Sequence, residues 1–413
     1  MGRLSKLIYI LGNYNITIVM KTCLKCLLPE THETIKYNNS GVCNICESSV
    51  YKQTNIDFKS KKRELDNLIS IYKGKFDYDC IVPFSGGKDS TWTLYYLIKE
   101  YDLKPLVVRF DHGFYRPNLE ENIKKCQRKL GFDMITFTPN WKVVQKLMLR
   151  SFLDKGDFCW HCHTGIFSYP MRVSVEKNIP LVFWGEKSSE YTSYYSFDDD
   201  EEVDEKRFNR YVNLGISADD MFIRFNGEIN KRELYPYTFP KLNELKQINS
   251  KSVCLGSYIE WNPKENSKTI MKELEWSGDE VENVPPEYDY EKIECYMQGV
   301  RDYIKYIKRG YSRVSHLSAI DLRNNDITKE KALENINLYE GKKPQSLKIF
   351  LDLIGITEEE FYTIAKSHII SPNKFSKTDT NAKQPKDFKN WSTDGKANRS
   401  EVNKIITEWL KKH

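Results

Sequence analysis

The sequence predicts an α/β fold: a doubly wound parallel sheet, preceded by a small cysteine-rich module and followed by a mainly helical region. Three observations predict it. Short apolar runs alternate with helical patterns from about residue 77 onward, which is typical of a parallel sheet covered by helices on both faces. Two Cys-x-x-Cys pairs precede this region, and the strand signals fade beyond about residue 265.

The length of 413 residues suggests roughly two to three domains. We expect a leader of unclear role over 1–19, a zinc-ribbon module over 20–55 and the α/β domain over 56–265. A helical substrate-binding domain over 266–370 follows, and 371–413 form a polar linker with a terminal amphipathic helix.

The zinc-ribbon prediction rests on two pairs of cysteines, Cys23 with Cys26 and Cys43 with Cys46. Each tight Cys-x-x-Cys turn can present two thiolates to one tetrahedral Zn²⁺. The metal then supplies the folding energy that a short segment with few apolar residues lacks. Two disulfides or free thiols are the alternative.

Within the α/β domain, strands are expected over 79–84, 105–110, 133–138 and 180–184, because each is a short apolar or β-branched run. Helices are expected over 89–102, 119–130 and from 141, with one more after an interruption at 159–165. In the C-terminal part, helical patterns cover 293–307 and 329–339. The apolar residues of 400–411 fall on one helical face, so this last helix should dock back on the protein.

The loop after the first strand carries the strongest chemical signal, and its residues are Ser85, Gly86, Gly87, Lys88, Asp89 and Ser90. A strand, this loop and a helix place unpaired backbone N–H groups, the helix dipole and a lysine around one point, which binds phosphates. The glycines allow close backbone approach, and the serine hydroxyls can donate to phosphate oxygens. Val82 stands where a Walker A motif needs glycine, so hydrolysis of a γ-phosphate is not implied.

This loop resembles the PP-loop of ATP pyrophosphatases, which have a HUP-like fold. A narrower resemblance runs from Met20 to about Gly341. The segments that carry it are MKTCLKCLLPETHETIKYNNSGVCNIC, VPFSGGKDS, VVRFDHGF, LGFDMITFTPNW, GDFCWHCHTGIF, IPLVFWGE and YIKRGYSRVSHLSAIDLRNNDITKEKA. Together they resemble the N-acetyl sugar amidotransferases of surface-polysaccharide and flagellar-glycan biosynthesis.

That resemblance implies an enzyme that uses ATP and Mg²⁺ to adenylate the acetamido oxygen of a nucleotide-linked sugar. Ammonia then displaces AMP, and the product is an acetamidino sugar. Such sugars belong to lipopolysaccharide O-antigen, capsule or flagellar glycan. The chain shows no glutaminase, because position 2 of either candidate start is Gly2 or Lys21 and not cysteine. We therefore expect a separate glutaminase partner.

Site residues follow from the loop and from the carboxyl ends of the strands, where open parallel sheets bind ligands. Lys88 and Asp89 are expected to be catalytic, and Asp89 and Asp111 are the natural metal or ribose contacts. Glu186 could take a proton from ammonia or orient it, with a structural role as the alternative. The polar cluster expected to hold a sugar diphosphate, or else to be surface helix charges, consists of Lys308, Arg309, Arg313, His316, Asp321 and Arg323.

A third pair, Cys159 and Cys162, lies in the α/β domain, with Cys254 far downstream. This spacing resembles the cysteines that hold a [4Fe–4S] cluster in tRNA-thiolating PP-loop enzymes, so tRNA thiolation is the alternative function. A second zinc site with His161 or His163 as a ligand, or plain buried thiols, are further possibilities. A nucleotide-binding regulatory module without enzymatic activity is the third class.

The composition limits which kinds of partner and location we expect. The net charge of +5 is mild for this length and argues against a nucleic-acid partner. The sequence contains no run of about 18 uninterrupted apolar residues, so we expect no membrane span and a cytoplasmic location.

Overall fold

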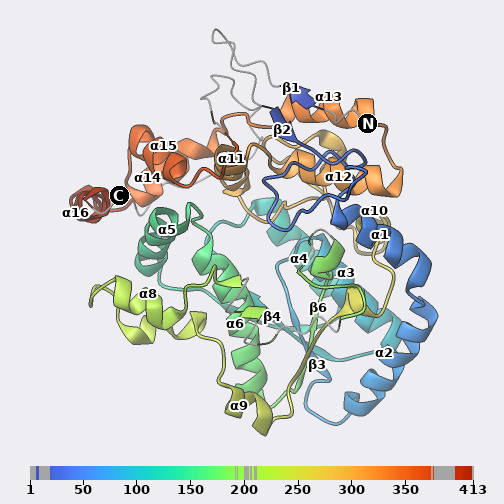
Figure 1. Ribbon diagram of the computed structural model, residues 1–413. Helices are drawn as coiled ribbons and strands as arrows, with labels where there is room; N and C mark the ends of the chain where they lie inside the picture. The colour runs from blue at the N-terminus through green and yellow to red at the C-terminus, as the bar shows by residue number, and fades with distance from the viewer. Residues whose placement is uncertain are drawn as a thin grey trace.

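The computed structural model describes residues 6–8, 19–190, 192, 194–199, 204, 207–208, 212–373, 375 and 396–411. Most of the expected leader over 1–19 and most of the polar linker that begins at 371 lie outside these residues. Figure 1 shows the sheet in the lower half of the molecule, the C-terminal helices above it, and the cysteine module beside α12.

A five-stranded parallel sheet forms the centre of the α/β domain, with the order β5-β4-β3-β6-β7. Its strands are β3 (Cys80–Pro83), β4 (Pro105–Phe110), β5 (Asp133–Phe137), β6 (Leu181–Trp184) and β7 (Lys251–Cys254). The order of strands reverses between β3 and β6, and ligands of such sheets bind beyond the carboxyl ends at this point. β3 leads into the phosphate loop and β6 leads to Glu186, so both expected site segments lie at the switch point.

Helices cover both faces of the sheet, which confirms the predicted doubly wound architecture. On one face, α3 (Lys88–Tyr101), α4 (Pro117–Leu130) and α10 (Pro263–Leu274) pack on Val82, Val107 and Phe183. On the other face, α6 (Trp160–Lys177) packs on Ile81, Val108 and Val182. Because side chains alternate along a strand, neighbouring residues of β3 supply the two cores.

Two parts of this domain differ from the sequence prediction. The edge strand β7 was not anticipated, because its four residues form too short an apolar run. The expected interruption at 159–165 is wrong, since α6 begins at Trp160 and continues to Lys177. Gly165 lies inside this helix for a packing reason: a Cβ there would collide with the ring of Phe110.

The remaining helices of the N-terminal half are α1 (Asn44–Asn55), α2 (Phe58–Tyr72), α5 (Trp141–Lys155), α8 (Ala218–Arg224) and α9 (Leu242–Gln247). The short strands β1 (Lys6–Ile8) and β2 (Val19–Lys21) pair antiparallel. Short 3-10 helices cover Ser188–Glu190, Lys231–Tyr237, Leu255–Ser257 and Pro286–Tyr288. Among the described residues, no helix has the length and apolar character needed to cross a membrane.

The C-terminal region is helical, as predicted. It contains α11 (Gln298–Arg309), α12 (Arg313–Asn324), α13 (Lys329–Tyr339), α14 (Ser346–Ile354), α15 (Glu358–Ser367) and α16 (Arg399–Leu410). The helix over 329–339 is confirmed to the residue, whereas that expected over 293–307 begins only at Gln298. Val402, Ile406 and Trp409 of α16 join the core around α14 and α15, so the predicted docking of the last helix is confirmed.

Candidate functional site

The phosphate loop is held in one conformation by its own hydrogen bonds and by a tryptophan. Gly86 has φ +82°, a region that favours glycine. The hydroxyls of Ser85 and Ser90 lie 3.2 Å apart, and the backbone N–H of Gly87 donates to Ser85 Oγ at 3.2 Å. Trp276 Nε1 donates to the carbonyl of Gly86 at 2.9 Å. The loop is therefore shaped before a ligand arrives.

Lys88 is buried at the start of α3 and surrounded by carboxylates. Its Nζ lies 2.6 Å from Asp89 Oδ2 and 2.9 Å from Glu291 Oε1. Burial lowers the pKa of Lys88, but the carboxylates of Asp89, Glu291 and Glu186 outweigh it and raise the pKa well above its usual value. Lys88 is thus a permanent cation.

Two carboxylates from the segment before α11 stand over the loop. Glu291 pairs with Lys88, and although burial opposes it, this pairing holds the pKa of Glu291 below its usual value. Glu294 lies so close to Gly87 that a Cβ there would be 3.0 Å from its Oε2. An incoming phosphate therefore competes with these carboxylates for Lys88 and the loop.

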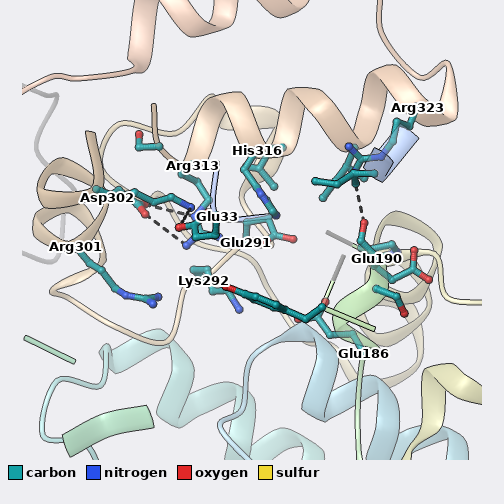
Figure 2. Close-up of a pocket in the computed structure, with 18 of the residues that line it drawn as sticks. Glu33, Glu186, Glu190, Glu291, Lys292, Arg301, Asp302, Arg313, His316 and Arg323 are labelled. Carbon is teal, nitrogen blue, oxygen red and sulfur yellow. Dashed lines mark hydrogen bonds and ion pairs between the residues drawn. The ribbon is translucent and has the colours of Figure 1, made fainter. Parts of the chain in front are cut away.

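A cavity of about 800 Å³ lies between the sheet, the cysteine module and the C-terminal helices. Its size falls in the range of roughly 300–1,000 Å³ that is usual for small-molecule sites. Lys88 and Glu186 line it from the α/β domain, and Glu33 and Lys52 from the N-terminal part. The residues of the C-terminal helices that line it include Arg301, Asp302, Lys305, Lys308, Arg309, Arg313, His316 and Arg323. Figure 2 shows charged side chains from all three parts around this space.

The cationic cluster expected to hold a sugar diphosphate divides into residues with different surroundings. Lys308 Nζ donates to the carbonyls of Lys155 and Gly156 at 2.8 and 3.1 Å. Arg309 donates to the carbonyl of Thr31, and its Nε lies 3.2 Å from Glu33 Oε1. These two cations tie α11 to neighbouring segments.

The other members of that cluster lie on α12. Arg313 Nη2 lies 3.5 Å from Asp302 Oδ1. Arg323 donates from Nη2 to the carbonyl of Glu190 at 3.3 Å, whereas its buried Nη1 has no hydrogen-bond partner among the described residues. His316 also lines the cavity. Burial and the nearby charges of Lys305 and Arg313 lower the pKa of His316 well below its usual value, so it is neutral.

Asp321 and Asp111 are engaged away from the cavity. Asp321 accepts a hydrogen bond from the Tyr288 hydroxyl at 2.7 Å and pairs with Lys264 at 2.9 Å. Asp111 follows β4 and accepts from the backbone N–H of Gly113 at 2.8 Å and from Thr138 Oγ1 at 3.1 Å. The structure therefore does not bring these two carboxylates together with Lys88 around the cavity.

Glu186 does share the cavity with Lys88. Its backbone is tightly packed: a Cβ on the preceding residue, Gly185, would lie 3.0 Å from Thr93 Oγ1 of α3. The next residue, Lys187, points elsewhere and donates to the carbonyls of Phe197 and Asp199. Glu186 is thus placed at the carboxyl end of β6, beside the first turn of α3.

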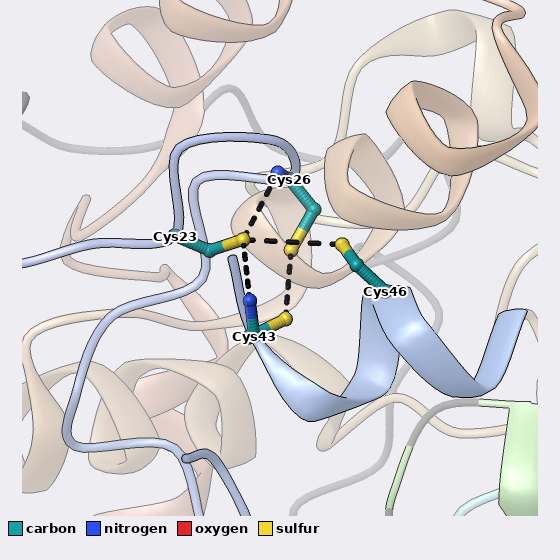
Figure 3. Close-up of side chains that lie close together, drawn as sticks. All are labelled: Cys23, Cys26, Cys43 and Cys46. Atoms are coloured by element: carbon teal, nitrogen blue, oxygen red, sulfur yellow. Dashed lines mark hydrogen bonds between the residues drawn. The ribbon is translucent and has the colours of Figure 1, made fainter. Parts of the chain in front are cut away.

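The four N-terminal cysteines form a compact buried group (Figure 3). Cys23 Sγ lies 3.9 Å from Cys46 Sγ, and Cys26 Sγ lies 3.6 Å from Cys43 Sγ. Sulfurs of a tetrahedron with Zn–S bonds of about 2.3 Å are about 3.8 Å apart, so the donor set fits one tetrahedral ion. The backbone N–H of Cys43 also points at Cys23 Sγ at 3.3 Å, a contact that stabilises a thiolate. These cysteines form a candidate metal site.

Cys159, Cys162 and Cys254 are not brought together in this way. Cys159 belongs to the core around α5 and α14, with Cys162 and Cys295 packed against it, whereas Cys254 belongs to the core beneath α6. Arg207 donates to Cys254 Sγ at 3.6 Å. Among the residues that the structure describes, only the N-terminal quartet brings together three or more His, Cys, Asp or Glu side chains with ligand atoms within 4.8 Å of one another.

Residues 287–401 match the family model described as LPS biosynthesis protein WbpG-like, C-terminal domain. The chain carries a WbpG-like C-terminal domain. This domain supplies Glu291 and Glu294 over the phosphate loop as well as α11 and α12 on the cavity.

Three further likenesses are partial. An uncharacterized protein, MJ1599 of Methanocaldococcus jannaschii, is 29% identical over 106 residues, which are 26% of this chain and 38% of that protein. NMN synthetase from Francisella tularensis has 11% identity over 69% of this chain and 93% of that one, with a TM-score of 0.34. The U34-tRNA thiolase NcsA from Methanococcus maripaludis, solved with its [4Fe–4S] cluster, has 15% identity over 76% and 88%, with a TM-score of 0.29.

Sequence reasoning missed several residues that the WbpG-like domain brings to the cavity, namely Glu291, Lys292, Arg301 and Lys305. The helical spacing of Arg301, Lys305 and Lys308 could have indicated one cationic face of α11. Glu291 gives no such signal, because it lies outside any helix or strand and some 200 residues from its partner Lys88.

Proposed function

We propose that this protein is an ATP-dependent, AMP-forming amidotransferase of lipopolysaccharide O-antigen, capsule or flagellar-glycan biosynthesis. Its substrate is a nucleotide-linked N-acetyl sugar, whose acetamido group becomes an acetamidino group. One observation carries the proposal: a single cavity combines Lys88 of the phosphate loop with the cationic helices of a WbpG-like domain. Such a cavity suits the joint binding of two phosphate-bearing substrates.

The chemistry has two displacement steps. In the first, the acetamido oxygen attacks the α-phosphorus of ATP, a new P–O bond forms, and the bond to pyrophosphate breaks. In the second, the lone pair of ammonia attacks the imidate carbon, the C–O bond to AMP breaks, and the surplus protons leave. Adenylation is needed because an amide oxygen is a very poor leaving group, whereas AMP is a good one.

The residues would act mainly by positioning and by charge. Lys88 and the N–H groups of the loop would hold the departing pyrophosphate. Asp89 would contribute a carboxylate to Mg²⁺, which supplies further charge neutralisation when bound; Asp111, expected from sequence to share this role, lies away from the cavity. Glu186 would accept a proton from ammonia or orient it.

The cysteine quartet would hold one Zn²⁺ in a structural role, since its buried thiols leave no ligand position open to a substrate. Glu33 of this module pairs with Arg309 and lines the cavity. The metal would therefore act on the site by keeping a wall of the cavity folded.

Ammonia would come from a separate glutaminase. The test compares the purified protein supplied with glutamine and with ammonium. We expect AMP formation to depend on ammonium. Equal use of glutamine by the protein alone would rule out the separate partner.

The test of the main proposal is an incubation with ATP, Mg²⁺, ammonium and a panel of UDP- and CMP-linked acetamido sugars. We expect AMP, pyrophosphate and a sugar product lighter by about one dalton, because O is replaced by NH. ATP consumption without a change in any acetamido sugar would contradict the proposal. A brown, iron-containing protein after anaerobic purification would instead favour tRNA thiolation with a cluster at Cys159 and Cys162.

A further inference from the structure

We propose that Arg301 is the main diphosphate-binding residue for the second substrate, with Lys292, Lys305 and Arg313 around the same position. This inference rests on the proposed function for the identity of that substrate, a sugar diphosphate. It differs from the set expected from sequence, in which Lys308, Arg309 and Asp321 were included and Arg301 was absent.

Arg301 and Lys292 differ from Lys308 and Arg309 in how their side chains are engaged. Arg301 and Lys292 both line the cavity, and neither side chain has a hydrogen bond or an ion pair to another described residue. Figure 2 shows both side chains directed into the space beneath Arg313 and His316. Lys308 and Arg309, in contrast, donate hydrogen bonds to backbone carbonyls. The free donors are therefore those that a ligand can use.

The face of the cavity formed by α11 and α12 carries more positive than negative charge. Six cations of α11 and α12 line the cavity, and Asp302 is the one carboxylate that these helices add to it. Burial lowers the pKa of Lys305, and the nearby charges of Arg313 and Arg301 lower it further against the pull of Glu33 and Asp302. Like charges held together in a partly buried site repel each other, and a bound anion relieves the repulsion.

The guanidinium of Arg301 stays charged. Burial lowers the pKa of Arg301, but Cys159 and the carboxylates of Asp157 and Asp302 raise it to a net value above the usual one. A planar guanidinium presents paired N–H donors that match phosphate oxygens. Arg301 thus offers the geometry for a diphosphate, while Lys292 and Lys305 add point charges.

The nucleotide that binds Lys88 is a different ligand in a different electrostatic setting. Asp89, Glu291 and Glu186 surround Lys88, so carboxylates outnumber the cation at that end of the cavity. At a distinct position, Arg323 on α12 has a buried Nη1 without a hydrogen-bond partner among the described residues, with a side chain only 5% exposed. Arg323 therefore offers a further hydrogen-bond donor to a ligand in the same cavity.

The shared chemistry is a sugar diphosphate, which a nucleotide or a lipid can carry. The experiment measures binding of UDP-N-acetylglucosamine, and separately of farnesyl diphosphate, to the full chain and to Arg301→Ala by calorimetry and thermal shift. We expect the variant to weaken binding of one of these compounds by roughly ten- to a hundredfold, the loss of a charge-assisted bidentate contact. Binding of ATP with Mg²⁺ should change less than about twofold.

Controls separate recognition from folding. Arg128→Ala removes the same side chain from an exposed position on α4 and should change neither affinity. Arg301→Lys keeps the charge but not the paired donors, so its affinity should fall between wild type and alanine. Ligand-free Arg301→Lys should unfold at about the wild-type Tm, because it keeps a positive charge beside Asp157 and Asp302; weaker diphosphate binding at an unchanged Tm therefore reports recognition and not folding.

Binding is measured without turnover, so failure of this inference differs from failure of the proposed function. Undiminished binding of the diphosphate compounds to Arg301→Ala overturns the inference even if amidotransfer occurs. Binding of neither compound to wild type overturns it as well. Loss of binding in the variant supports it even if no acetamidino product is found.

Discussion

Two cationic regions face the same cavity, and they differ in how the protein neutralises them. At the phosphate loop, Lys88 is held between Asp89 and Glu291 at 2.6 and 2.9 Å. On α11, the side chain of Arg301 has no hydrogen bond or ion pair to another described residue. The first region holds more carboxylates than cations until a phosphate displaces one of them, whereas the second carries an excess of positive charge. The comparison suggests that the second substrate can bind before ATP does.

The largest effect should follow from loss of the proposed zinc site, because the cysteine module contacts the second region. Glu33, from the cysteine module, is the partner of Arg309 and Lys305. Structural zinc contributes about 10–16 kcal/mol of binding free energy, so Cys46→Ser should release the metal and lower Tm by roughly 10 °C or more. Metal analysis measures the bound metal, and thermal unfolding measures the Tm. Cys295→Ser, outside the quartet, should retain the metal, and unchanged metal content in Cys46→Ser would contradict the site.

A change at the first region should give the next largest effect. Lys88→Met removes the cation that we propose holds the departing pyrophosphate, and it leaves Asp89 and Glu291 without their partner. We expect kcat to fall by about 10²–10³-fold, as for loss of one group that stabilises charge in a transition state. Lys99→Met, on the exposed side of the same helix, is the matched control. Steady-state AMP formation is the measurement, and near-normal turnover in Lys88→Met would refute the role of the loop.

Glu291→Gln would make the first region resemble the second. The variant keeps the shape of the side chain but removes a competitor for Lys88, so ATP with Mg²⁺ should bind about three- to tenfold more tightly. Calorimetry measures this affinity. Weaker binding would mean that Glu291 assists the nucleotide instead of competing with it. Glu287→Gln, four residues earlier, is the control for the same chemical change.

The smallest effect concerns pH and the cationic helices. Burial, Lys305 and Arg313 lower the pKa of His316 well below its ordinary value. The unfolded chain therefore binds a proton at this residue where the folded protein does not, and stability falls as pH drops below about 6.5. The slope is at most about 1.4 kcal/mol per pH unit for one histidine. Denaturant unfolding of wild type and His316→Asn between pH 7 and 5 measures how the free energy of unfolding depends on pH. This dependence should be shallower in the variant, and equal slopes would contradict the lowered pKa of His316.

The sheet was predictable because its strands are short apolar runs bounded by turns. The phosphate loop was predictable because six consecutive residues carry its chemistry, and the structure places them between β3 and α3 as expected. β7 was missed, since a four-residue edge strand carries little periodic signal. The late start of α11 was also missed, because the apolar residues before Gln298 pack as an irregular segment and not as a helix.

The cavity itself was only half predictable. Sequence grouped Lys308, Arg309, Arg313, His316 and Arg323 because they lie near one another along the chain, and all five line the cavity. The sequence could not show which of these side chains donate hydrogen bonds to backbone carbonyls. Nor could it pair Glu291 with Lys88, because that contact depends on how the WbpG-like domain packs on the sheet.

The cavity wall contains residues from Glu33 to Asp326, and this has a consequence for protein synthesis. Translation delivers the cysteine module first, the sheet next and the cationic helices last. A nascent chain on the ribosome therefore displays a phosphate loop long before it has a place for the second substrate. Since Glu291 and Glu294 precede α11 and α12 along the chain, the carboxylates that contact Lys88 and Gly87 are synthesised just before the cationic helices.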